Sequence, residues 1–118
     1  MIEFIRKRCN ELENWSLAQS NPCFEVWLYY HLHTAKPFIY NSEICAEWKQ
    51  LVNRLIIGGF DSRRHPIYIA SASKNAANNF VVIDGKPDIG STEVFNLANT
   101  IIRLVGSKLE KVLKEIEK

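Results

Sequence analysis

The feature that most constrains the fold of this 118-residue chain is an Asn-Pro pair followed by a mostly apolar run, residues 23–32. Asn21 can accept hydrogen bonds from the exposed amides of a first helical turn, and Pro22 at the first helical position loses no hydrogen bond. The run is apolar on nearly all sides, which predicts a buried helix. This helix should end near Lys36, because the residue before Pro37 disfavours helical backbone.

Apolar residues also recur at helical spacing on either side of this segment. Residues 2–12 predict a short amphipathic helix. Residues 42–57 predict a longer helix with Trp48 in its apolar stripe, and Gly58-Gly59 can end it by adopting the left-handed conformation. Residues 15–18 have the alternation and the length of a short strand.

The second half of the chain predicts two more helices. One begins at Pro66, and its many small residues would let another element approach closely. The other is capped by Ser91 or Thr92, and Glu93 in its first turn suits the positive end of the helix dipole. Its apolar stripe continues almost to the last residue, with a weak point or bend at residues 106–107.

Between these two helices, residues 81–83 are predicted to be extended and Asp84-Gly85 to form a turn. The chain has no repeats and no linker. We therefore expect one domain, residues 1–118, of the mostly α class, or α+β at most, with four to five helices and one or two short strands.

The charge balance alone gives little support for nucleic-acid binding. The chain has 15 Lys and Arg residues against 13 Asp and Glu residues, a formal net charge of +2. Phosphate binding needs clustered cations, and the two short basic clusters, residues 6–8 and 63–65, are most simply interpreted as solvated surface. Arg63 and Arg64 are kept as candidates for phosphate contact.

Three cysteines, Cys9, Cys23 and Cys45, lack the closely spaced pairs that are typical of zinc sites, so their pattern gives a zinc site no support. Scattered cysteines suit a reducing cytoplasm. The charges near the start are too early and too dense for a signal peptide, and no apolar run approaches the ~20 residues of a membrane span. We expect a cytoplasmic protein with no membrane partner.

Residues 20–31, Ser-Asn-Pro-Cys-Phe-Glu-Val-Trp-Leu-Tyr-Tyr-His, closely resemble a hallmark of the RloB-like family. In that family a strand ends in a Ser-Asn-Pro-x-Phe-Glu-x-Trp run that opens a helix, and a histidine follows. A weaker similarity to the family's tail covers residues 75–80 and 87–97, so the resemblance runs over residues 15–105. The motif positions in this sequence are Ser20, Asn21, Pro22, Phe24, Glu25 and Trp27.

The resemblance implies a bacterial phage-defence protein that acts with an ATPase partner in abortive infection. It also implies a Toprim-like α/β fold, of which this chain resembles the C-terminal part. Toprim chemistry needs a Glu and an Asp-x-Asp that hold a divalent metal ion. This sequence has no Asp-x-Asp, because Asp61, Asp84 and Asp88 stand apart.

Three functions stay open at this point. The first is a non-catalytic C-terminal part of an RloB-like protein, which supplies a packing surface or a surface for a partner such as an ATPase or a second copy. The second is a metal-dependent nuclease, completed by a missing segment or by an oligomer, which would use Mg²⁺ or Mn²⁺. The third is a stand-alone helical interaction module. The missing carboxylates favour a protein that is not an enzyme and has no cofactor.

Two residues are candidates for catalysis if the nuclease hypothesis holds. Glu25 lies in a mostly apolar helix, where a buried carboxylate is costly unless it is paired or binds a cation. Its structural alternative is a half-exposed residue at the helix start. His31 is the acid-base candidate, and a histidine on an apolar face is more often a core residue.

Overall fold

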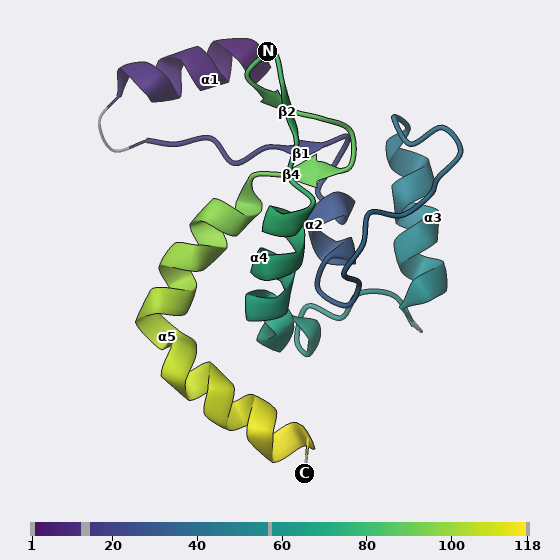
Figure 1. Ribbon diagram of the computed structural model, residues 1–118, viewed down its shortest axis with the longest axis vertical. Helices are drawn as coiled ribbons and strands as arrows, with labels where there is room; N and C mark the ends of the chain where they lie inside the picture. Colours follow the sequence, from purple (N-terminus) through teal and green to yellow (C-terminus); the bar gives the residue numbers. More distant parts are fainter. Residues whose placement is uncertain (1, 13–14, 57, 118) are drawn as a thin grey trace.

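Helices make up most of the regular structure in the computed structural model, which describes residues 2–12, 15–56 and 58–117 (Figure 1). Within these residues the chain is mostly α, with only short strands, as the sequence predicts. The helices are α1 (Ile2–Glu11), α2 (Glu25–Tyr29), α3 (Cys45–Leu55), α4 (Ile69–Asn78) and α5 (Val94–Glu117), and a 3₁₀ helix, His65–Tyr68, leads into α4.

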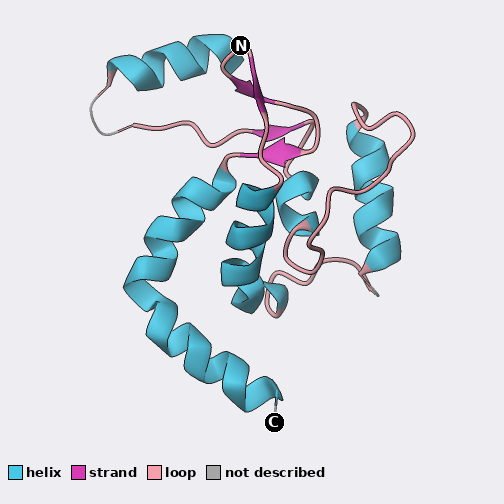
Figure 2. Cartoon of the chain, viewed as in Figure 1, coloured by secondary structure: helices cyan, strands magenta, loops and turns pink. Residues whose placement is uncertain are grey.

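The strands form two small antiparallel pairs (Figure 2). Strand β1 (Ser20–Asn21) pairs with β4 (Ser91–Thr92). Strands β2 (Val82–Ile83) and β3 (Lys86–Pro87) form a hairpin. The predicted turn at Asp84-Gly85 is confirmed, since both residues have the positive φ angles, 53° and 75°, that a two-residue hairpin turn requires.

The core lies where α2 and α4 are enclosed between α3 and α5 (Figure 1). Its largest fully buried side chains include Trp48 of α3, Tyr30 and Val26. Small residues bring α4 and α5 together: Ala72 and Ala76 of α4 and Ala98 of α5 are all buried. The predicted close approach to the small-residue helix is therefore confirmed.

The prediction for the central apolar helix is wrong at both ends, because α2 has only five residues. Asn21 does not cap it, since its side-chain amide donates to the Pro87 carbonyl at 3.0 Å and its backbone belongs to β1. After Tyr29 the chain leaves the helix to form tertiary hydrogen bonds. Tyr29 Oη donates to the Ala35 carbonyl at 2.7 Å, and Asn79 Nδ2 donates to the Thr34 carbonyl at 2.9 Å.

Two other boundaries differ from the prediction. Residues 15–18 form no strand, because pairing with β4 begins only at Ser20. Helix α3 begins at Cys45 rather than near residue 42, and Ile57, where it was predicted to end, lies outside the described residues. The glycines that follow have positive φ, as expected.

Helix α5 begins at Val94, so the predicted cap at Thr92 is confirmed, whereas Glu93 precedes the first turn rather than lying in it. Thr92 Oγ1 accepts a hydrogen bond from the Val94 amide at 3.2 Å, which satisfies one of the free amides of the first turn. The helix is continuous to Glu117 but changes direction near its middle (Figure 1). A Gly-Ser pair such as Gly106-Ser107 is a common cause of such a bend.

Helix α1 is held to the rest of the chain by two ion pairs rather than by apolar packing, because none of its described residues is buried. Arg6 pairs with Glu93 at 2.6 Å, and Glu3 pairs with Lys86. The interpretation of residues 6–8 as solvated surface is therefore wrong for Arg6, whose partner lies 87 residues away. Across the described residues, no helix is both long and apolar enough to cross a membrane.

Candidate functional site

The two segments that resemble the RloB-like family lie against each other in the fold. Ser20 is paired with Thr92 in the β1–β4 ladder, and their hydroxyl oxygens lie 2.6 Å apart. Tyr30 donates its hydroxyl proton to the Gly90 carbonyl at 2.9 Å, and its own carbonyl accepts from Asn75 Nδ2 at 2.9 Å. Hydrogen bonds thus connect the segment of residues 20–31 with the segments of residues 75–80 and 87–97.

The other motif residues divide between the core and the surface. Trp27 is buried, whereas Phe24 is exposed. Pro22 lies between β1 and α2, after a cis peptide bond. Glu25 is the first residue of α2 and is half-buried, which matches the structural alternative considered for it.

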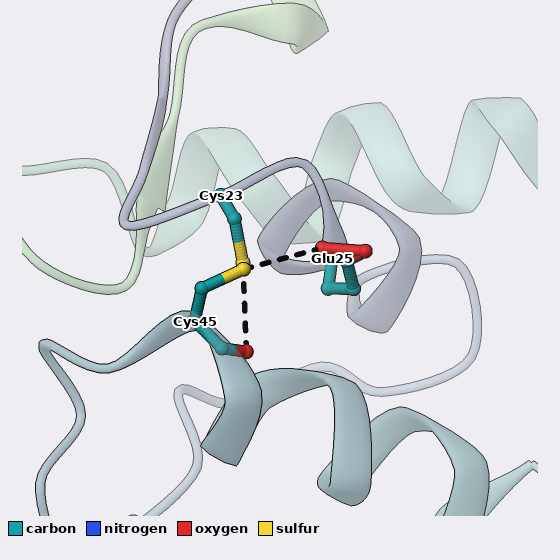
Figure 3. Close-up of side chains that lie close together, drawn as sticks. All are labelled: Cys23, Glu25 and Cys45. Carbon is teal, nitrogen blue, oxygen red and sulfur yellow. Dashed lines mark hydrogen bonds between the residues drawn. The ribbon is translucent and has the colours of Figure 1, made fainter.

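Glu25 lies beside two thiols, those of Cys23 and Cys45 (Figure 3). Cys23 precedes α2, and Cys45 is the first residue of α3. Both cysteines are free and half-buried. Cys45 Sγ donates to Glu25 Oε2 at 3.9 Å, and Cys23 Sγ donates to the Cys45 carbonyl at 3.8 Å. The three ligand atoms all lie within 4.8 Å of one another.

Sequence reasoning missed this cluster. Closely spaced cysteine pairs reveal only metal ligands that lie in the same short turn of the chain. Cys23 and Cys45 are 22 residues apart, and they meet because α2 packs against α3. Burial raises the pKa of the Cys23 thiol, and hydrogen bonding with Cys45 and Glu25 raises it further. The only local signal was the short Cys-x-Glu spacing of residues 23 and 25.

His31 lies apart from this cluster, in the aromatic core. Its side chain is buried, and Nδ1 lies 3.1 Å from the Trp27 carbonyl. Its ring packs edge-on against Trp27 and Phe60. Burial lowers the pKa of His31, because the charged imidazolium would lose its hydration. This environment is that of a core histidine.

The lowered pKa of His31 predicts acid sensitivity. Between the unfolded pKa of 6.5 and the lower folded value, the unfolded chain binds more protons, so the free energy of unfolding falls as the pH falls. The contribution of His31 to the free energy of unfolding should be fully present above pH 6.5. It should be lost as the pH falls toward the folded-state pKa of His31. Urea unfolding of the wild type and of His31→Gln at several pH values measures this, and equal pH slopes would contradict it.

Arg63 and Arg64 are both exposed on the turn that precedes the 3₁₀ helix. The Arg63 guanidinium pairs with Asp61 at 3.5 Å, which offsets part of the local positive charge. Neither arginine lines the pocket beside Glu25, which is formed by Leu28, Lys49, Val52, Asn53 and Phe60.

No family model, no curated protein and no solved structure matches this chain. The RloB-like resemblance of the motifs therefore stays a prediction.

Proposed function

We propose that this chain is a non-catalytic C-terminal part of an RloB-like bacterial phage-defence protein, and that it provides a surface for another polypeptide. The family part rests on the two segments that resemble the family, which contact each other across 60 and more residues of sequence. Two segments that both resemble one family are expected to contact each other if this chain has the fold of that family.

The observation that carries the proposed role is an uncovered apolar face on α5. Leu104 is 81% exposed, and five further apolar residues of this helix are 41–56% exposed. We define the α5 apolar face by its exposed residues, Leu97, Ile101, Leu104, Val105, Val112 and Ile116. An exposed apolar surface of this kind is typical of an interaction site.

The outline of the molecule agrees with an unfilled contact surface. The radius of gyration is 15.1 Å, whereas a compact domain of this length has about 13.5 Å. The C-terminal part of α5 extends away from the β1–β4 pair (Figure 1). A second polypeptide packed against α5 would cover this apolar surface.

A second copy of this chain is the partner that the charges favour. Lys108, Lys111 and Lys114 alternate with Glu110 and Glu115 along the same half of α5. Mixed charges beside an apolar stripe allow two antiparallel copies to pair through the same surface. An ATPase, the partner that the resemblance implies, would then bind the resulting assembly.

The nuclease alternative has less support from the site. Glu25 has two thiols beside it, whereas Mg²⁺ prefers oxygen ligands. Asp61 is paired with Arg63, and Asp84 lies in the exposed hairpin turn. In the described part of the chain, the cysteine-glutamate cluster is the only group of three or more suitable metal ligands.

The proposed surface predicts that the chain associates with itself. Sedimentation at increasing concentration should show a dimer for the wild type and at least about tenfold weaker association for a Leu104→Lys, Val112→Lys variant, since lysine cannot be buried without a partner. Leu32→Lys, which changes an exposed leucine outside α5, is the matched control and should dimerise normally. A monomeric wild type at about 100 µM would contradict the choice of partner.

Two further assays test the family and the absence of catalysis. Bacteria that carry this coding region with an adjoining ATPase gene should form fewer phage plaques, and the double lysine variant should lose that protection. Unchanged plaque counts for the wild type would contradict the defence assignment.

Cleavage of DNA or RNA with Mg²⁺ or Mn²⁺, lost in Glu25→Gln, would favour the nuclease instead.

A further inference from the structure

We infer that Cys23, Glu25 and Cys45 form a binding site for a thiophilic divalent cation, with Zn²⁺ as the fitting ion. This inference is independent of the α5 apolar face and of the family resemblance. It rests on the convergence of two thiols and one carboxylate from different elements at the α2–α3 contact (Figure 3).

The spacing of the ligand atoms suits tetrahedral zinc. Zn–S bonds are about 2.3 Å and Zn–O bonds about 2.0–2.2 Å, so ligand atoms around zinc lie about 3.5–3.8 Å apart. Cys45 Sγ and Glu25 Oε2 lie 3.9 Å apart, and no two of the three ligand atoms are separated by more than 4.8 Å. Side-chain movements of less than about 1 Å would close the triangle around an ion.

The kinds of ligand decide which metal fits. Two sulfur ligands favour Zn²⁺ over Mg²⁺, Ca²⁺ or Mn²⁺, which prefer sites made of oxygen. The site is therefore chemically different from a Toprim carboxylate centre. Its one carboxylate, Glu25, would complete a set of three protein ligands.

Three protein ligands leave one position of a tetrahedron free. Glu25 also lines an open pocket of about 280 Å³, together with Leu28, Lys49, Val52, Asn53 and Phe60. Water or a small anionic ligand in that pocket can supply the fourth ligand. Lys49 on its rim would favour an anion there.

A bound ion would add a direct link between α2 and α3, which pack together but are joined along the chain by a long irregular segment. Residues 31–44, between α2 and α3, contain no helix or strand, and Phe38 and Tyr40 within them are exposed. Zinc held by Cys23 and Glu25 on one side and Cys45 on the other would fix α3 against α2. Binding to the folded chain alone would therefore raise its thermal stability.

Titration of the reduced full chain with Co²⁺, followed by competition with Zn²⁺, tests the site. Co²⁺ should bind one to one and give the absorption of tetrahedral, thiolate-bound cobalt, and Zn²⁺ should displace it. Cys23→Ser and Cys45→Ser should each weaken Zn²⁺ binding at least about 100-fold, since even loss of a residue that only supports a ligand costs about 10–100-fold.

Cys9→Ser is the matched control, because Cys9 lies in α1 and outside the cluster. It should bind Zn²⁺ like the wild type, and Zn²⁺ should raise the thermal midpoint of both. If a cysteine variant does not fold, Glu25→Gln serves in its place and should retain the sulfur-to-cobalt absorption with weaker affinity. Absence of Zn²⁺ binding in the reduced wild type, or equal loss in Cys9→Ser, would overturn the inference.

Discussion

Replacing Trp48 by alanine is expected to lower the free energy of unfolding by about 3–5 kcal/mol. Trp48 is 1% exposed, packs edge-on against Tyr29, and donates its indole N–H to the Ser42 carbonyl at 2.7 Å. The substitution leaves a cavity between α2 and α3 and removes that hydrogen bond. Because small domains have only about 5–15 kcal/mol in total, much of the stability should be lost.

Trp15→Ala is the matched control for this prediction. Trp15 is 69% exposed, so the same chemical change should alter the free energy of unfolding by less than about 0.5 kcal/mol. Urea unfolding followed by circular dichroism measures both variants. Equal losses for the two tryptophans would show that Trp48 does not organise the α2–α3 contact.

Replacing Glu93 by glutamine should release α1 and cost about 2 kcal/mol. The side chains of Arg6 and Glu93 are only 22% and 16% exposed. The Glu93 carboxylate also accepts a hydrogen bond from the backbone amide of Gln19 at 3.1 Å. The ion pair raises the pKa of Arg6, chiefly through the hydrogen bond to Glu93. This cost is smaller than that of breaking a fully buried pair, since water still reaches both groups.

Hydrogen exchange can locate the effect of this substitution. Amides of α1 should lose protection in Glu93→Gln while those of α4 keep theirs, because α1 has no buried residue to hold it in place. Glu11→Gln is the matched control, since the Arg8–Glu11 pair is exposed and lies within one helix. A double-mutant cycle with Arg6→Ala that gives no coupling energy would contradict the prediction.

Both substitutions concern how the candidate sites are positioned. Trp48 lies one turn after Cys45 on α3, so its packing against Tyr29 holds Cys45 beside Cys23. Glu93 immediately precedes α5 and connects the start of that helix to α1. The proposed metal site therefore depends on the α2–α3 contact, and the orientation of the α5 apolar face depends on the segment around Glu93.

The sequence by itself determined the elements that depend on local periodicity. Apolar spacing predicted α1, α3, α4 and α5, and turn chemistry predicted the turn at Asp84-Gly85 and the glycine end of α3. It also predicted the mostly α class. Helical hydrogen bonds join residues four positions apart, so their signal lies within a short window of sequence.

Only the tertiary structure decided what Asn21, Cys23 and Cys45 do. The local pattern made Asn21 a helix cap, but a carbonyl 66 residues away takes its side-chain amide. The spacing of the cysteines gave no sign of a shared site, yet the packing of α3 on α2 places their thiols together beside Glu25. These contacts join distant parts of the chain, and no local pattern encodes them because their geometry exists only after the helices have packed.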